Sequence, residues 1–219
     1  MLQQIDFDGS NYIGVYARAS EKYGIFSRNV PDFCLKEAEK NLGIEVLKTT
    51  IAHTSVVGCM IAMNSNGMIV NRFIGENEER KLKSLDLNMG HTRSTLNAVG
   101  NIILVNDKAA LVHPKVSKSM VEVIRDVLGV EVFKENIGNF VNLGMACALT
   151  NKGIVCHPDT KREEVKKLEE IFGVKGGWST VNHGTSFVGS GILCNSKGAL
   201  IGERTTTVEI TRIQDTLDL

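Results

Sequence analysis

Residues 99–133 read VGNIILVNDKAALVHPKVSKSMVEVIRDVLGVEVF and contain strand, turn and helix signals in a fixed order. The run Val99–Val105 is apolar and rich in β-branched residues, which is typical of a buried strand. Asn106-Asp107-Lys108 are turn residues. The segment Ala109–His113 is therefore expected to return as the second strand of a hairpin, and Pro114 ends it because proline has no N–H to donate.

A helix is expected next, from Ser117 to Leu128. Five apolar side chains recur there at three- and four-residue spacing, which places them on one helix face: Met120, Val121, Ile124, Val127 and Leu128. Gly129 stands where a left-handed residue closes a helix. Val130–Phe133 then alternates as a third strand, so the whole unit is ββαβ.

The same unit recurs five times along the chain. A glycine opens an apolar run at spacings of 44, 42, 44 and 45 residues, and these glycines are Gly14, Gly58, Gly100, Gly144 and Gly189. A polar turn follows each of them. A period of this length indicates a repeat architecture. The predicted repeats span about 11–54, 55–97, 98–141, 142–185 and 186–219, within a single domain of residues 1–219.

The helices of the other repeats carry their own start and stop signals. Thr160 with Glu163, and Thr206 with Glu209, have the spacing of a capping box. The second repeat has the weakest helix, Glu76–Leu85, with an aspartate at position 86 in place of the closing glycine.

The last repeat ends at Leu219 without a third strand, while residues 3–7 alternate like a strand ahead of the first repeat. An N-terminal strand that completes the last repeat removes both the unpaired strand and an exposed sheet edge. An open solenoid would instead need polar capping repeats. We therefore predict an α+β fold, a closed ring of five ββαβ repeats with pseudo-five-fold symmetry and helices outside. Such a ring resembles the pentein architecture.

The composition excludes several classes of protein. Twenty-five basic residues balance twenty-five acidic ones, so the basic excess of a generic nucleic-acid binder is absent. From the residues at the start of the sequence we expect no signal peptide, and from the length of the apolar stretches we expect no membrane span. The cysteines are odd in number and form no C-x-x-C pair, which predicts reduced thiols in a cytoplasmic protein: Cys34, Cys59, Cys147, Cys156 and Cys194.

Some penteins are enzymes that modify guanidino groups with a cysteine, a histidine and acidic residues. Cys194 in the last repeat and His183 shortly before it offer such a pair. However, Cys194 lies in the middle of a predicted strand, where a small buried hydrophobe is expected. No acidic residue follows it until Glu203. A guanidino-modifying hydrolase that uses Cys194 and His183 therefore remains the alternative to a binding protein.

Two His-Pro pairs stand at the same place in successive repeats, His113-Pro114 and His157-Pro158. A pair of metal ligands is conceivable because imidazole is a common ligand. Strand termination explains the repetition better, since no carboxylates at ligand spacing accompany the histidines. We predict no metal site and no cofactor.

Several motifs resemble one family, the translation initiation factor 6 family, and the chain length resembles its archaeal form. The motifs are Ile13-Gly14, Leu96-Asn97-Ala98-Val99-Gly100-Asn101, Asn106-Asp107 with Ala110–Pro114, Val130–Phe133, and Thr205-Thr206-Thr207 followed by Glu209. The resemblance covers essentially all 219 residues. It implies a five-bladed pentein ring without enzymatic activity.

The resemblance also implies a binding role. Members of the family bind the large (50S) ribosomal subunit on the face that meets the small subunit, and so prevent subunit joining. Their main contact is large-subunit ribosomal protein fourteen, near the sarcin–ricin loop. The contact positions carried over are Gly14, Cys59, Asn101 and Asn64. Position 59 departs from the eukaryotic relatives, which carry arginine there. The protein is expected to be a monomer; a ring whose helices bind some other protein is a further alternative.

Overall fold

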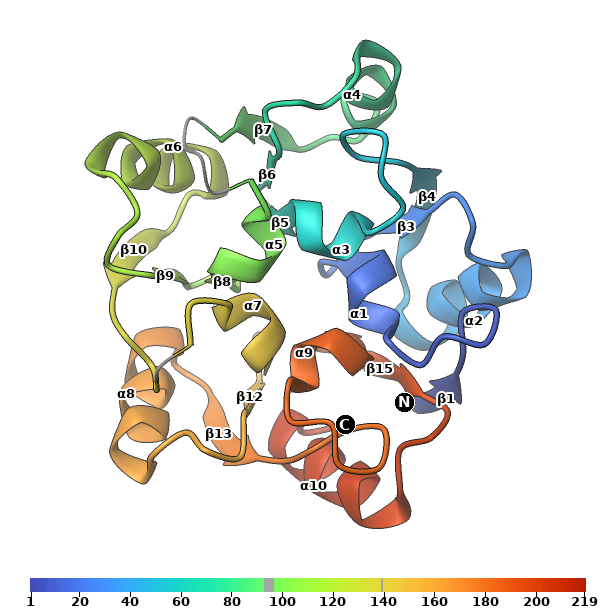
Figure 1. Ribbon diagram of the computed structural model, residues 1–219, viewed down its shortest axis with the longest axis vertical. Helices are drawn as coiled ribbons and strands as arrows, with labels where there is room; N and C mark the ends of the chain where they lie inside the picture. The colour runs from blue at the N-terminus through green and yellow to red at the C-terminus, as the bar shows by residue number, and fades with distance from the viewer. Residues whose placement is uncertain (93–96, 139) are drawn as a thin grey trace.

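The computed structural model describes residues 1–92, 97–138 and 140–219. Leu96, which belongs to one of the motifs above, lies outside these residues. The described chain forms a mixed α+β fold with ten helices and five separate three-stranded sheets. Figure 1 shows the units side by side around a common centre, with the longer helices on the outside and the short helices close to the centre.

All five sheets have the same topology. Two antiparallel strands form a hairpin, and a third strand runs parallel to the second strand of that hairpin. The hairpins with their third strands are β2 Ala17–Ala19, β3 Tyr23–Ser27 and β4 Glu45–Thr49; β5 Ile61–Met63, β6 Gly67–Val70 and β7 Asn88–His91; β8 Ile103–Val105, β9 Ala109–Val112 and β10 Glu131–Lys134; β11 Ala148–Leu149, β12 Gly153–Cys156 and β13 Lys175–Trp178; and β14 Ile192–Asn195, β15 Gly198–Gly202 and β1 Leu2–Ile5.

The third strand of the last sheet comes from the start of the chain. Strand β1 pairs in parallel with β15, from Leu2 opposite Ala199 to Ile5 opposite Gly202. It ends earlier than the expected strand 3–7 because Phe7 forms an isolated bridge with Ser10 instead.

The longer helices lie on the outside (Figure 1) and are α2 Asp32–Leu42, α4 Glu76–Leu82, α6 Lys118–Leu128, α8 Arg162–Phe172 and α10 Thr207–Leu217. Gly129 closes α6 in the left-handed conformation, with φ of 65°, as predicted. Helix α4 ends at Leu82, before the expected Leu85. There the Ser84 hydroxyl donates to the Lys81 carbonyl, which would otherwise accept from the next helical turn.

One of the two predicted capping boxes is shifted by a residue. In α8 the Glu164 carboxylate, not that of Glu163, accepts from the backbone N–H of Lys161 at 2.8 Å. Lys161, not Thr160, is therefore the N-cap residue. Helix α10 begins as predicted, because the Thr206 N–H donates to Glu209 at 2.7 Å and the Thr206 hydroxyl accepts from the Glu209 N–H.

The Glu209 carboxylate also connects α10 to the loop before α9. It accepts from the Thr180 hydroxyl at 2.6 Å and from the N–H of Gly184 at 2.9 Å. Burial alone would raise the pKa of Glu209, but hydrogen bonds from Thr180, Thr206 and Gly184 outweigh it and lower this pKa to about 2. Glu209 therefore stabilises the fold mainly in its charged form.

We expect Glu209→Gln to lower the free energy of unfolding by about 2 kcal/mol at neutral pH, because hydrogen bonds to a charged group are lost. The unfolded carboxyl titrates near pH 4.3. Above that pH the free energy of unfolding of the natural chain should therefore exceed that of Glu209→Gln by the full amount. The difference should disappear as the pH falls toward 2. Urea unfolding of both chains at pH 7, 4 and 2.5 measures the difference; an equal difference at all three would contradict this account.

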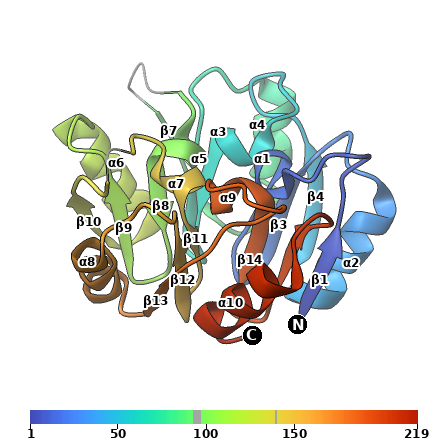
Figure 2. The same ribbon diagram turned by 60° about the horizontal axis from the view of Figure 1, so that its bottom comes forward.

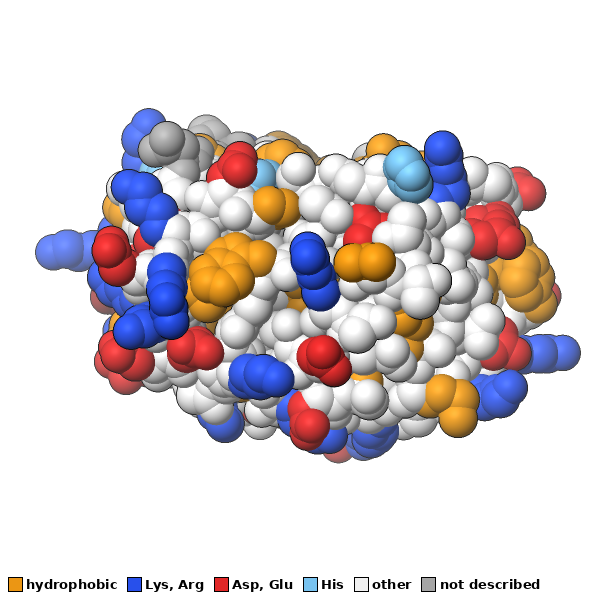
Figure 3. Space-filling model, turned by 90° about the horizontal axis from the view of Figure 1, so that it is seen from below, with side chains coloured by type: hydrophobic (Ala, Val, Ile, Leu, Met, Phe, Trp, Pro, Cys, Tyr) orange, Lys and Arg blue, Asp and Glu red, His pale blue; other side chains and the backbone are white. Residues whose placement is uncertain are grey.

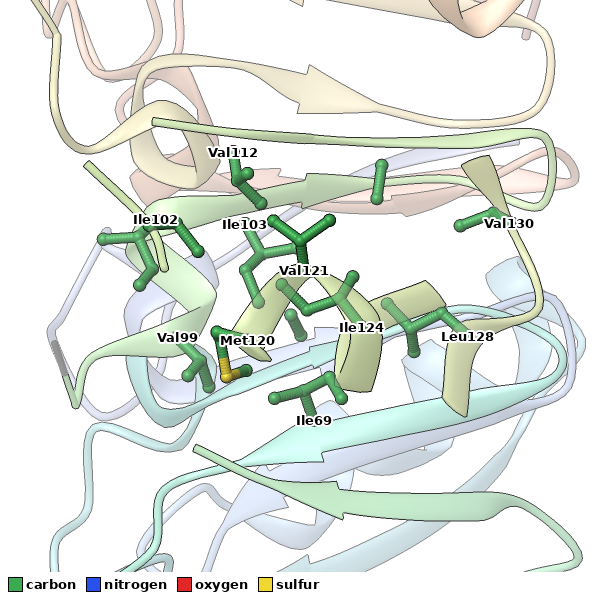
Figure 4. Packing of buried hydrophobic residues seen from close by; sticks show 13 residues of the cluster. Ile69, Val99, Ile102, Ile103, Val112, Met120, Val121, Ile124, Leu128 and Val130 are labelled. Carbon is green, nitrogen blue, oxygen red and sulfur yellow. The ribbon is translucent and has the colours of Figure 1, made fainter. Parts of the chain in front are cut away.

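The buried side chains connect neighbouring units. In Figure 4, Met120, Ile124 and Leu128 of α6 lie between Ile69 of the preceding unit and Val112 of their own. Helix α6 also contacts strands β6 and β7. Burying such side chains contributes about 1.5–3 kcal/mol each, so the unit interfaces are part of the hydrophobic core.

The central helices are the main departure from the sequence prediction. The expected strand Val99–Val105 begins as a helix, α5 Val99–Ile102, and only Ile103–Val105 is a strand. The other units have the same short helix: α1 Ile13–Tyr16, α3 Val57–Met60, α7 Leu143–Ala146 and α9 Val188–Gly191.

The five repeated glycines lie in these short helices and bring them into backbone contact. A Cβ atom on Gly100 would lie 2.0 Å from the carbonyl oxygen of Gly58, and one on Gly58 would lie 2.0 Å from that of Gly14. The same contact joins Gly144 to Gly100, Gly189 to Gly144, and Gly14 to Gly189. The contacts thus return from α9 to α1. Only glycine permits such close approach of two backbones.

No helix in the described ranges is both long and apolar enough to span a membrane.

Candidate functional site

The molecule has two different ends. The helix face consists of the five short helices and the loops beside them, residues 7–12, 28–31, 51–56, 71–75, 97–98, 113–117, 137–138, 140–142, 157–161, 181–187 and 203–206. The turn face consists of the hairpin turns, residues 20–22, 64–66, 106–108, 150–152 and 195–197. Figure 2 shows both chain termini at the end opposite the short helices.

Three of the four predicted contact residues lie together on the helix face. Gly14, Cys59 and Asn101 belong to α1, α3 and α5, which contact one another in that order. Gly14 is buried, whereas Cys59 and Asn101 are partly exposed. The Asn101 residue is thus partly exposed, but its side-chain oxygen Oδ1 is buried and has no hydrogen-bond partner within the described chain.

Asn64 is not brought together with these residues. It lies at the turn face and is only 3% exposed. Its Nδ2 donates to the carbonyls of Asn106 and Leu128, at 3.2 and 2.9 Å. Its Oδ1 accepts from the N–H groups of Asn66 and Gly67. A side chain engaged in this way has little left for an outside partner, so the structure gives Asn64 a role inside the fold.

Two further asparagines play the same part and were missed from the sequence. Nδ2 of Asn106 donates to the carbonyls of Thr150 and Phe172, and that of Asn195 donates to those of Ser20 and Leu42. Each thereby satisfies one of the last carbonyls of the next unit's long helix, which has no partner within the helix itself. The signal is visible in retrospect, because each asparagine stands six residues after a repeated glycine.

The helix face also exposes large hydrophobic side chains. They are Tyr12, Phe73, Val141 and Phe187, with exposed fractions of 49, 56, 46 and 40%. Tyr12 and Phe187 stand directly before α1 and α9. The guanidinium of Arg72 lies over the Phe73 ring, 4.6 Å from its centre. Exposed hydrophobic side chains grouped on one face are typical of a protein-binding surface. Sequence reasoning did not select any of them.

The outer wall is different in character. Figure 3 shows it from one side, with acidic and basic side chains interspersed. Several form exposed ion pairs, such as Lys167 with Glu135 at 2.8 Å. Each exposed ion pair of this kind contributes at most about 1 kcal/mol to the free energy of unfolding. The mixture of acidic and basic side chains is typical of a surface that faces solvent.

A central channel runs between the units and consists of two adjoining cavities of about 40 and 30 Å³. Both cavities have Met63, Leu149 and Cys194 in their walls. The larger one is lined by residues of all five units and also contains the Arg18 side chain.

Cys194 and His183 do not form a catalytic pair. Burial raises the pKa of the Cys194 thiol to about 12; the nearby Arg18 lowers it to a smaller extent, and Glu21 raises it further. A nucleophilic thiol needs a lowered pKa instead. His183 lies in an exposed loop and does not line the channel. Arg18 would also repel a guanidinium substrate in this small space.

The two His-Pro histidines each close a turn. Nδ1 of His113 accepts from the Lys115 N–H at 3.2 Å, and Nδ1 of His157 accepts from the Asp159 N–H at 3.1 Å. Strands β9 and β12 end one residue before them. Across residues 1–92, 97–138 and 140–219, no group of three or more His, Cys, Asp or Glu side chains is arranged to hold a metal ion.

Comparison with known proteins places the chain in a family. The sequence model of the eIF-6 family matches residues 2–216. Proteins named Translation initiation factor 6 are similar over nearly their whole length. The one from Methanosarcina mazei is 39% identical, over 99% of this chain and 98% of its own. Those from Picrophilus torridus and Thermococcus onnurineus are 36 and 35% identical, over 99% of this chain and 100 and 97% of their own. The chain therefore belongs to the eIF-6 family of translation initiation factors.

Proposed function

We propose that this protein binds the large ribosomal subunit through its helix face and thereby prevents the small subunit from joining. The proposed contact is large-subunit ribosomal protein fourteen, near the sarcin–ricin loop. The chain is an eIF-6 family member, and its helix face exposes the aromatic side chains of Tyr12, Phe73 and Phe187. The partly exposed residues Cys59 and Asn101 lie on the same face. This combination is the observation that carries the proposal. In this proposal the protein acts in the cytoplasm as a monomer and catalyses no reaction.

We further propose that the fold is a pentein ring, one domain of five ββαβ repeats closed by the N-terminal strand. The common topology of the five sheets and the circuit of glycine contacts from α1 to α9 support it. Such a ring presents a broad, rigid surface, since its short helices are held together backbone to backbone. A rigid surface loses little conformational entropy on docking, which suits a protein that acts by occupying space.

The charges favour docking on a protein more than on RNA. Binding to phosphates needs a basic surface and weakens steeply with salt, whereas this chain has no net charge. At position 59 the side chain is also uncharged, because burial raises the pKa of the Cys59 thiol despite the nearby Arg18. The binding affinity must then come mainly from aromatic side chains that are exposed in the free protein and become buried in the complex. Such side chains often dominate protein interfaces.

We expect Asn101→Ser to weaken binding to isolated large subunits by about tenfold, equivalent to about 1.4 kcal/mol. The free energy of unfolding should change little, because Oδ1 of Asn101 makes no hydrogen bond within the described chain. Sedimentation with separated subunits measures the binding, and urea unfolding measures the stability.

Asn66→Ser is the matched control, since it makes the same chemical change at an exposed position on the turn face. It should bind as the natural chain does. If Asn101→Ser bound normally, or both variants lost binding equally, the helix face would not be the contact surface.

A further inference from the structure

Among the described residues, a single charged side chain lines the larger cavity of the central channel. Arg18 of β2 stands four residues after Gly14, and the equivalent residues of the other units also line the channel: Ala62, Leu104, Ala148 and Leu193. Four of the five symmetric positions are thus small or apolar. Only the first unit places a cation there.

The Arg18 guanidinium has an incomplete set of partners. Its Nη2 donates to the carbonyls of Gly58 and Gly100, at 2.9 and 3.0 Å. Its Nε is buried and has no acceptor within the described residues. None of the ion pairs found among those residues involves Arg18. The Arg18 residue as a whole is partly exposed. A guanidinium that lies beside an apolar cavity without a counter-ion is costly, because its charge has lost part of its water without gaining a partner.

The surroundings do not supply the missing negative charge. Burial lowers the pKa of Arg18, opposed in part by Cys59 and Cys194, but a guanidinium stays protonated at neutral pH. The thiols of Cys59 and Cys194 are neutral, since burial raises the pKa of both. The side chains of Leu104 and Leu193 are apolar. The nearest carboxylates, Glu21 and Asp107, line only the outer cavity, where serine and asparagine residues already hydrogen-bond to them.

The size of the channel limits what can sit beside Arg18. A cavity needs a free volume of roughly 10–15 Å³ to hold one water molecule. The larger cavity, of about 40 Å³, therefore admits only a few atoms. An oxyanion such as phosphate would need more room and several donors. A halide ion is only slightly larger than a water molecule and can be held by one or two charged N–H groups in an otherwise apolar site.

We propose that the central channel binds one halide-sized monovalent anion beside the Arg18 guanidinium. The anion neutralises the guanidinium, whose Nη2 stays hydrogen-bonded to the carbonyls of Gly58 and Gly100. It enters from the turn face, past Glu21 and Asp107, which line the outer cavity. It is a structural ligand that stabilises the ring.

Bromide tests the proposal directly, because its anomalous scattering distinguishes it from water. Crystals of the natural chain equilibrated with bromide should show an anomalous peak in the channel within hydrogen-bonding distance of Arg18. A channel without such a peak, occupied by water alone, would overturn the proposal.

A solution measurement completes the test. At constant ionic strength, replacing gluconate, which is too large to enter, by millimolar chloride should raise the urea midpoint of the natural chain. The midpoint of Arg18→Met should not respond to the exchange. An equal response of both chains, or a bromide peak with no chloride effect in solution (binding at crystal concentration only), would contradict a structural anion site. The bromide experiment uses the natural chain, so it decides the matter even if Arg18→Met does not fold.

Discussion

Replacing Gly100 by alanine should lower the free energy of unfolding by about 4 kcal/mol or more, at the extreme of single substitutions. The added Cβ would lie 2.0 Å from the carbonyl oxygen of Gly58 and 2.5 Å from that of Ile61. Both are backbone atoms, so no side chain can rotate away. The overlap can be relieved only if α5 moves away from α3. The contacts of α3 with α1 would then shift as well.

Gly9→Ala is the control for the substitution itself. Gly9 has a φ of 82° and no atom within 4 Å of the added Cβ, so only backbone strain of about 1–2 kcal/mol is expected. Urea unfolding of both variants, followed by circular dichroism, gives the comparison. A Gly100→Ala chain as stable as Gly9→Ala would show that the glycine contacts do not hold the short helices together. A chain that fails to fold agrees with the expectation.

The second large effect is expected at Asn64. Asn64→Ala should lower the free energy of unfolding by about 2–4 kcal/mol, because it leaves buried carbonyl and N–H groups without partners. Among these are the Asn106 carbonyl and the Gly67 N–H in the turn. Thermal and urea unfolding measure the loss. Asn66→Ala is the control, since Asn66 is exposed and its side-chain amide makes one hydrogen bond within the described chain, to the Leu128 carbonyl at 3.1 Å.

Asn64→Ala also separates a structural role from a binding one. Under conditions where the variant is folded, it should bind large subunits as tightly as the natural chain. A variant of unchanged stability with weakened binding would restore Asn64 to the contact surface and contradict its role between units.

The sequence predicts the repeated unit well because its signals are local. The turn at Asn106, the helix from Ser117 to Leu128 and its closing Gly129 all depend on neighbours in the chain. The short helix Val99–Ile102 does not. Its apolar, β-branched pattern is that of a strand, and what selects a helical turn is the contact of Gly100 with Gly58, which local sequence does not encode.

The site was predictable to a similar degree. Cys59 and Asn101 occupy nearly equivalent positions in two repeats, so a repeat architecture brings them near one another. Asn64 is only five residues from Cys59, yet the intervening strand β5 carries it to the opposite face. Tyr12 and Phe187 had no distinguishing motif, because an exposed aromatic residue is recognised only once burial is known. Arg18 could have been found, as the one charged residue among the five equivalent positions.

The most direct test of the proposed function is a subunit-joining experiment. Purified protein is incubated with large subunits, small subunits are added, and the mixture is separated on a sucrose gradient. The account predicts that the protein migrates with the large subunit and that the peak of joined ribosomes falls as protein is added. Migration with the small subunit, or an undiminished peak of joined ribosomes at saturating protein, would contradict it.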